Sequence, residues 1–328
     1  MTDRTALVLG ATGGIGGEVA RLLKAEGWAV RALHRQAALR ASGTDADNFA
    51  WHQGDVMRRE DVMKAAEGAS LIAHAVNPPG YRKWNVTVLP MLDNTIAAAK
   101  ANGARILLPG TVYNYGPDAF PEPDEASPQN PLTVKGRIRA EMELRLREAT
   151  AGGAKALIVR AGDFFGPRAG NNWFAQGLVK PGQPVAAITY PGQPGVGHQW
   201  AYLPDVARTM VRLLGRDEAL EPFSTFHMQG HWDEDGTQMI AAIRRAVGRP
   251  DLPVRAFPWR LLMLASPFVP LFRELREMRY LWQVPLRMRN ARLTGVLGAE
   301  PHTPLDEAVR ATLIGLGCLS EERLSGQG

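Results

Sequence analysis

Residues 5–17 read TALVLGATGGIGG, an apolar run that leads directly into a glycine-rich turn. Gly10, Gly13 and Gly16 are spaced three residues apart, and a helical pattern follows from Glu18. Glycine permits a sharp reversal of the chain, a close approach of the backbone to a pyrophosphate, and tight packing of a helix on a strand. The start of such a helix offers N–H groups to phosphate. The stretch therefore predicts a dinucleotide-binding turn. Its expected cofactor contacts are Gly10, Thr12, Gly13, Gly14, Ile15 and Gly16.

Length and composition fit a globular enzyme. The chain has 328 residues, of which 45% are apolar and 22% charged, and no apolar run is long enough to span a membrane. Cys318 is the only cysteine, so intrachain disulfides are excluded and structural zinc is not expected. Because Asp3 and Arg4 lead directly into the first apolar run, we expect no signal peptide and a cytoplasmic location.

The net charge of +5 does not by itself predict nucleic-acid binding. Arginines are dense in residues 244–292, but they alternate with Leu, Met, Trp and Glu, as on the solvated faces of amphipathic helices. His227 and His231 lie near three acidic residues, but the strand-like pattern there argues against a shared helical face for a metal. We therefore expect a small-molecule substrate, with no nucleic acid, membrane or metal as partner.

Strand-like and helix-like segments alternate through the first half of the chain. The expected strands are 6–9, 29–33, 70–75, 105–109 and 156–160, and the expected helices between them are 18–26, 59–67, 89–102 and 138–150. This alternation predicts an α/β fold, a doubly wound Rossmann sheet with helices on both faces. We expect a dinucleotide-binding core over 1–166 and a smaller, mainly helical substrate cap over 167–328. Residues 198–230 of the second part are expected to return to the core.

The residues after the glycine turn favour NADP over NAD. NAD-binding versions of this fold place an acidic residue about 20 residues beyond the glycines, on the ribose 2′-hydroxyl. Residues 27–44 contain no acidic residue, and the second expected strand leads into Arg35. A guanidinium suits a 2′-phosphate. Asp55 is placed to bind the adenine amino group, and the other expected cofactor contacts are Val56, Ala75 and Lys135. NAD stays possible.

Five landmarks occur in one order along the chain. They are the turn at 10–16, the Gly54-Asp55-Val56 segment, Tyr115-Gly116, the segment RAGDFFGP at 160–167, and YLPDVA at 202–207. In these landmarks the chain resembles the extended short-chain dehydrogenase/reductase family, also called the NAD-dependent epimerase/dehydratase family. The resemblance implies a Rossmann fold and hydride chemistry on a nicotinamide cofactor. It also implies a homodimer formed through the helices around 89–102 and 138–150.

The pair that normally carries the family's chemistry is missing. The family uses Tyr-x-x-x-Lys, but none of the six tyrosines here has a lysine four residues later. In the family a glycine follows the tyrosine. When Gly136 is aligned with that glycine, Lys135 stands at the tyrosine position and Arg139 at the lysine position. A second register places Thr133 and Arg137 there instead. Arginine can hold ribose hydroxyls, and a lysine desolvated beside another cation can act as an acid or base.

Other residues are candidates for the reacting end of the site. Counting back from Tyr115-Gly116, Thr111 takes the family's Ser/Thr position, and strand periodicity places Tyr113 on the same face as a substitute acid. Asn171, Asn172 and Trp173 follow the landmark that ends at Pro167, where family members contact substrate. His198 stands where many nucleotide-sugar members carry an arginine, so it is a further expected substrate contact. Its neutral imidazole weakens the sugar-nucleotide interpretation.

These observations leave three hypotheses for function. The first is an atypical NADP-dependent oxidoreductase that acts on a small or hydrophobic carbonyl or hydroxyl compound, with Thr111, Tyr113, Lys135 and Arg139 as its catalytic residues. The second is a non-catalytic dinucleotide-sensing protein that retained the fold and lost the Tyr-x-x-x-Lys pair. The third is an epimerase or dehydratase whose bound cofactor is reduced only transiently.

Overall fold

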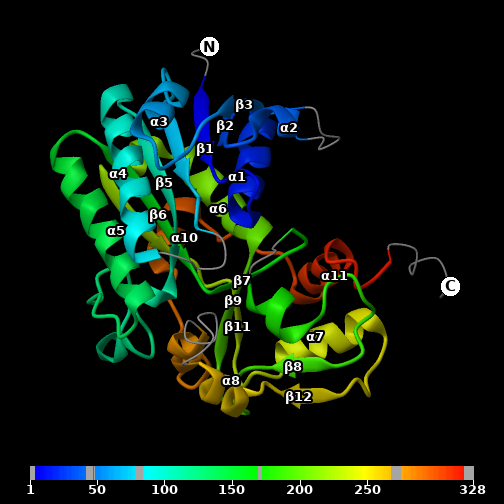
Figure 1. Cartoon of the computed structure of the whole chain (residues 1–328). Helices are drawn as coiled ribbons and strands as arrows, with labels where there is room; N and C mark the ends of the chain where they lie inside the picture. The colour runs from blue at the N-terminus through cyan, green and yellow to red at the C-terminus, as the bar shows by residue number, and fades with distance from the viewer. Residues whose placement is uncertain are drawn as a thin grey trace.

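A seven-stranded parallel sheet forms the larger part of the molecule (Figure 1). The computed structural model describes residues 4–41, 47, 49–78, 84–168, 172–266 and 275–320. The strand order is β10-β6-β5-β4-β1-β2-β3. Their bounds are β1 Thr5–Leu9, β2 Ala29–His34, β3 Ala50–Gln53, β4 Leu71–His74, β5 Arg105–Thr111, β6 Lys155–Ala161 and β10 Phe223–His227. This is the doubly wound Rossmann topology, extended by β10 at one edge, so the predicted fold class is confirmed.

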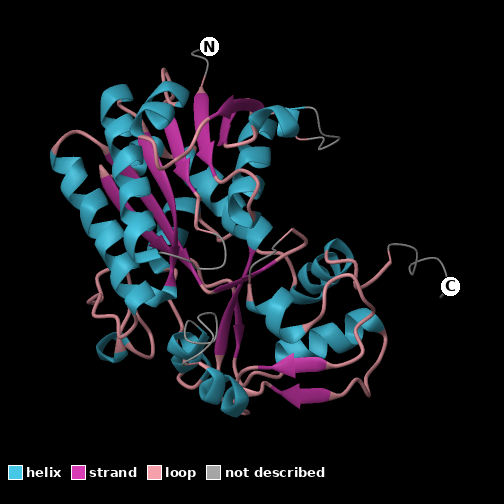
Figure 2. Cartoon of the chain, in the orientation of Figure 1, coloured by secondary structure: helices cyan, strands magenta, loops and turns pink. Residues whose placement is uncertain are grey.

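Helices cover both faces of this sheet (Figure 2). One face packs on α1 (Gly14–Ala25) and α6 (Leu203–Leu214), through apolar residues that include Leu23 and Met210. The other face packs on α3 (Arg59–Ala65), α4 (Trp84–Asn102) and α5 (Val134–Ala151). A short helix, α2 (Ala37–Ala41), follows β2. The central strands are buried on both sides because helices lie over both faces, which explains their almost continuous apolar sequences.

The remaining elements build a smaller unit below the carboxyl edge of the sheet. It contains a three-stranded sheet of β7 (Asp163–Phe165), β9 (His198–Tyr202) and β11 (His231–Asp233). A two-stranded sheet joins β8 (Ile188–Tyr190) to β12 (Val254–Ala256). The described helices of this part are η4 (Phe174–Leu178), α7 (Gln238–Val247), α8 (Trp259–Ala265), η6 (Met278–Trp282) and α11 (Leu305–Gly315). Helix α10 (Ala291–Leu297) packs instead on the large sheet, where it contacts β10 and α6.

A buried ionic network ties α5 to the large sheet. Arg160 of β6 is 1% exposed, and its Nε donates to Oε1 of Glu143 in α5 at 3.0 Å. Its Nη1 donates to Nε2 of His227 in β10 at 2.9 Å. The hydroxyl of Tyr115 lies 2.7 Å from the same histidine nitrogen. Burial, with the nearby Arg160 charge, lowers the pKa of His227 to about 3, so this histidine is neutral in the folded protein.

Two features of the described residues concern possible partners. No helix among them is long and apolar enough to cross a membrane. The same residues contain no cluster of three or more His, Cys, Asp or Glu side chains that could hold a metal ion.

Candidate functional site

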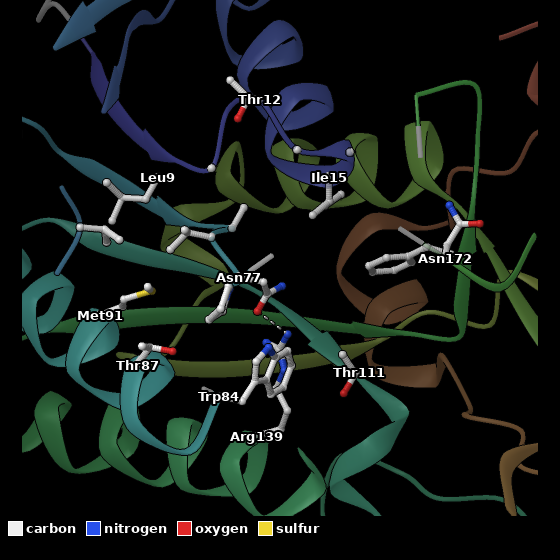
Figure 3. Close-up of a pocket in the computed structure, with 18 of the residues that line it drawn as sticks. Leu9, Thr12, Ile15, Asn77, Trp84, Thr87, Met91, Thr111, Arg139 and Asn172 are labelled. Carbon is white, nitrogen blue, oxygen red and sulfur yellow. Dashed lines mark hydrogen bonds between the residues drawn. The ribbon is translucent and has the colours of Figure 1, made fainter. Parts of the chain in front are cut away.

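A cavity of about 690 Å³ lies between the carboxyl edge of the large sheet and the smaller unit (Figure 3). One end of the cavity is lined by the glycine turn after β1, together with residues at and beyond the ends of β2 and β3. The opposite end is lined by residues of α4, α5, the end of β5, and the smaller unit. A crevice beyond the carboxyl ends of parallel strands is where ligands bind in open α/β sheets.

The glycine turn has no space for side chains. Gly10 has a φ of +94°, and a Cβ there would lie 2.5 Å from the carbonyl oxygen of Ala75. A Cβ on Gly16 would lie 2.2 Å from the carbonyl oxygen of Gly10. Gly16 therefore brings α1 against the turn, and it is not among the described residues that line the cavity. Gly10, Thr12, Gly13, Gly14, Ile15 and Ala75 do line it.

The first turn of α1 suits a phosphate. The residue before it, Gly13, provides no side-chain cap, and the first turn has no acidic residue. Backbone N–H groups and the positive end of the helix dipole therefore face the cavity without a competing carboxylate. The residues present fit a dinucleotide, because the tight turn and the uncapped helix are what a pyrophosphate requires.

The segment after β2 carries positive charge toward the cavity. Arg35 and His34 line it, and Gln53 fixes their turn by accepting the N–H of Ala37 at 3.0 Å. Burial, together with the charges of Arg40 and Arg35, lowers the pKa of His34.

Asp55 and Val56 follow β3 and also line the cavity, and Asp55 Oδ1 accepts the N–H of Met57 at 3.0 Å.

The first turns of α5 distinguish the two registers. Lys135 is 3% exposed and Arg139 is 8% exposed, and they lie four residues apart on the inner face of the helix. Arg137 is exposed and donates to the carbonyl of Leu132. Thr133 caps the helix by accepting the N–H of Gly136 at 2.9 Å. The geometry therefore favours the Lys135 and Arg139 register over the one built on Thr133 and Arg137, because Arg137 lies on the outer face.

Of that pair, Arg139 is among the described residues that line the cavity and Lys135 is not. Arg139 lines it, and its Nη2 donates to Asn77 Oδ1 at 3.1 Å, as the dashed line in Figure 3 marks. The guanidinium carbon lies 5.2 Å from the ring centroid of Trp84, within cation–π distance. Burial, with the charge of Arg139, lowers the pKa of His74 in β4 to about 3. Lys135 is buried outside the described lining of the cavity.

Two hydroxyl side chains lie where β5 ends. Thr111 is the last residue of β5, and Tyr113 lies in the following 3₁₀ turn, η2 (Val112–Asn114). Strand periodicity is therefore the wrong reason for placing Tyr113, because the strand has already ended. The Thr111 hydroxyl accepts the N–H of Tyr113 at 3.2 Å and fixes the turn. Both residues line the cavity.

The expected substrate contacts divide into three groups. Asn172 and Trp173 line the cavity, and Asn172 Oδ1 accepts the N–H of Ala175 at 2.8 Å. Asn171 lies outside the described residues. His198 is 6% exposed and lies outside the described lining, so the structure does not place it among the described residues that face the cavity. Its Nε2 lies 2.9 Å from Asp163 Oδ2, so Asp163 stands between it and the cavity.

Several lining residues were not predicted. Asp163 is the first residue of β7, lines the cavity, and accepts the Tyr113 hydroxyl at 3.4 Å. Asp163 lies within the RAGDFFGP segment at 160–167, and a carboxylate in that segment could have been predicted to line the site. The apolar walls also include side chains distant in sequence. These are Val76, Met91, Phe164, Phe257 and Leu275.

Comparison with known families decides the classification. A family model described as the NAD dependent epimerase/dehydratase family matches residues 6–227, more than half of the chain. The chain belongs to this family. It is therefore an NAD(P)-dependent enzyme of the epimerase and oxidoreductase type. No curated protein matches the chain.

Solved structures share the fold at low sequence identity. A protein described as a putative epimerase from Burkholderia cenocepacia is 19% identical, with a TM-score of 0.74 over 96% of this chain and 99% of that one. The UDP-glucose 4-epimerase of Thermotoga maritima, solved with UDP-glucose, is 16% identical, with a TM-score of 0.71 over 94% and 97%. The Thermus thermophilus UDP-glucose 4-epimerase, solved with NAD, is 19% identical, with a TM-score of 0.68 over 95% and 98%.

Proposed function

We propose that the protein is an NADP-dependent oxidoreductase that interconverts a small or hydrophobic carbonyl compound and the corresponding alcohol. The observation that carries this proposal is the pair of hydroxyl side chains, Thr111 and Tyr113, at the end of a cavity whose other end is a dinucleotide cradle. Trp84, Trp173 and Phe257 give the walls near these hydroxyls an apolar character. A homodimer is part of the proposal through the family resemblance, and a cytoplasmic location is part of it because no signal peptide is expected.

Residues of this chain supply the acid/base chemistry in this proposal. The nicotinamide, when bound, accepts or donates the hydride. The Tyr113 hydroxyl exchanges the proton of the substrate oxygen, and the Thr111 hydroxyl orients that oxygen. Arg139 holds the ribose hydroxyls through its guanidinium, since its pKa is too high for proton exchange. Lys135 is buried on the same helical face as Arg139, and it adds positive charge behind the part of the site that holds the ribose.

The preference for NADP is supported by the charge at the end of β2. Among the described residues that line the cavity, the carboxylates are Asp55 and Asp163, and neither follows β2. Arg35 does follow β2, so a 2′-phosphate there meets a cation, while a ribose diol would lack a carboxylate acceptor. NAD is the alternative cofactor, because a protein that shares this fold was solved with NAD.

The test is reduction of carbonyl compounds by NADPH and NADH. A panel of aliphatic and aromatic aldehydes and ketones of increasing size is assayed by the loss of absorbance of the reduced cofactor. We expect turnover with NADPH, and a loss of kcat of about 100-fold in Tyr113→Phe, the contribution typical of a general acid or base. Tyr190→Phe is the matched control, because its buried hydroxyl has no hydrogen-bond partner among the residues that the structure describes and lies outside the described lining.

Two results would overturn the proposal. NADPH binding without turnover of any compound in the panel would support the dinucleotide-sensing alternative. Cofactor that stays bound through purification, without net oxidation or reduction of carbonyls, would support the epimerase or dehydratase alternative.

A further inference from the structure

Three side chains form a hydrogen-bonded series that leads from the cavity into the protein. The Tyr113 hydroxyl donates to Asp163 Oδ1 at 3.4 Å. The other carboxylate oxygen, Oδ2, lies 2.9 Å from His198 Nε2. Asp163 is 7% exposed and His198 is 6% exposed. Tyr113 and Asp163 line the cavity, and His198 lies outside its described lining.

The fold holds both inner members of the series firmly. Asp163 begins β7 and His198 begins β9, and these two strands pair in the three-stranded sheet. The His198 ring stacks on Trp282, with 3.8 Å between the ring centroids and 6° between the planes. Trp282 is itself 1% exposed. The imidazole therefore has one well-defined orientation, with Nε2 toward the carboxylate.

We infer that Asp163 is the proton acceptor behind Tyr113 and that His198 is the positioning residue that holds it; this inference rests on the proposed function. A carboxylate can only accept hydrogen bonds, so the pairing requires a proton on His198 Nε2. A buried carboxylate with a single donor is poorly compensated for its lost hydration. The His198 N–H supplies the second donor and leaves Oδ1 directed at the phenol.

The proton balance of the step is complete. In alcohol oxidation the substrate O–H bond breaks, and its proton passes to the phenolic oxygen of Tyr113 while the phenolic proton passes to Asp163 Oδ1. The substrate C–H bond breaks with its electron pair, and the hydride leaves to the oxidised dinucleotide. The substrate gains a C=O bond, Tyr113 ends protonated as it began, and Asp163 ends as a neutral carboxylic acid. Carbonyl reduction is the reverse.

Other ionisable groups also face Asp163. Tyr190 from β8 is buried and Tyr280 from η6 is half-buried. Desolvation raises the pKa of both phenols, with the charges of Asp233, Asp235 and Asp163 adding to it at Tyr190 and the charge of Asp163 adding to it at Tyr280. Both phenols stay neutral across the range in which enzymes are assayed. Among the described residues, the side chains hydrogen-bonded to the Asp163 carboxylate are Tyr113 on one oxygen and His198 on the other.

The experiment separates the hydrogen bond of His198 from its packing. His198→Phe keeps a flat ring against Trp282 and removes the N–H, whereas His198→Gln keeps an N–H donor at a similar distance. We expect kcat to fall about tenfold in His198→Phe and to stay within about twofold in His198→Gln, with KM little changed in both. Asp163→Asn is expected to lower kcat about 100-fold. The pH dependence of kcat is expected to change in His198→Phe and to be retained in His198→Gln.

A control and a second measurement complete the test. His231→Phe replaces another buried histidine of the same small sheet, whose ring lies against Phe165, and it is expected to leave kcat unchanged. Nitrogen-15 NMR of labelled histidine in the protein without substrate is expected to show a proton on His198 Nε2, with a resonance that shifts in Asp163→Asn. Melting temperature and NADPH affinity are measured for each variant, so that loss of folding is recognised.

The outcomes are distinct. Equal kcat values in His198→Phe and His198→Gln would overturn the positioning role, and unchanged kcat in Asp163→Asn would overturn the acceptor role. In both cases a Tyr113→Phe variant without activity leaves the proposed function standing. Absence of turnover by the unmodified protein would overturn both.

Discussion

The glycine turn after β1 and the first turns of α5 line opposite ends of one cavity and differ in what they are made of. At the glycine turn the shape comes from backbone alone, with Gly10 against Ala75 and Gly16 against Gly10. At the start of α5 the shape comes from side chains, with Arg139 held by Asn77 and Trp84. A backbone-built site tolerates almost no substitution, whereas a side-chain-built site can change its chemistry. The sequence prediction places the missing Tyr-x-x-x-Lys pair in the second of these two regions.

The largest effect is expected at the glycine turn. Gly10→Ala adds a Cβ 2.5 Å from a backbone oxygen, at a φ of +94°. We expect loss of measurable NADP(H) binding by calorimetry and destabilisation of about 1–3 kcal/mol. Gly27→Ala is the matched control, because Gly27 has a φ of +80° but nothing within 4 Å of the added Cβ. It is expected to cost about 1 kcal/mol in stability and to leave the affinity unchanged. Equal affinities of the two variants would contradict a backbone-built cradle.

A smaller effect is expected at the start of α5. Arg139→Ala removes a buried guanidinium from the cavity lining, and we expect kcat/KM to fall roughly tenfold to 100-fold, as for loss of a hydrogen bond to a charged group. Arg137→Ala, two residues away on the exposed face, is expected to stay within about twofold of the unmodified protein. Steady-state kinetics with NADPH compare the two. A larger effect of Arg137→Ala would restore the register built on Thr133 and Arg137.

The smallest effect is expected at the adenosine end. Arg35→Ala is expected to raise the Kd of NADPH about tenfold and to leave that of NADH unchanged, because an exposed guanidinium contributes modestly to binding a phosphate. Arg31→Ala is the control, since Arg31 donates to the carbonyl of Ala65 at the end of α3. Fluorescence titration with both cofactors gives the ratio. Parallel changes for NADPH and NADH would remove Arg35 as the source of cofactor preference.

Local patterns in the sequence were enough to predict most of the large sheet. The expected strand 6–9 is β1, Thr5–Leu9, because a buried parallel strand is apolar throughout. The strand β3, with the sequence AWHQ, was not predicted, because it lies at the edge of the sheet and is only partly buried. Helix α5 starts at Val134 instead of 138, since its cap is the hydroxyl of Thr133 and the apolar pattern begins a turn later.

The candidate site was predictable only where its residues are close in sequence. The glycine turn is one continuous stretch, so its spacing was visible. The contact between Asp163 and His198 joins residues 35 positions apart, and no local pattern reports it. His198 was therefore interpreted as a substrate contact, when pairing of β7 with β9 places it behind Asp163. Tyr113 was selected for a periodicity that ends at Thr111, and the turn capped by Thr111 is what directs it to the cavity.

The anchor of α5 lies apart from the part of the helix that lines the cavity. The helix is fixed to the sheet through Glu143, two helical turns beyond Lys135, by the buried guanidinium of Arg160. Neither partner belongs to the reacting end of the cavity. The side chain of Arg139 can therefore be changed without removing this anchor, whereas Gly136 cannot take a side chain, because its Cβ would lie 2.3 Å from the carbonyl oxygen of Tyr113. In α5 the attachment of the helix and the chemistry of its cavity end thus rest on different side chains, which makes position 139 a suitable place to install new reactions by design.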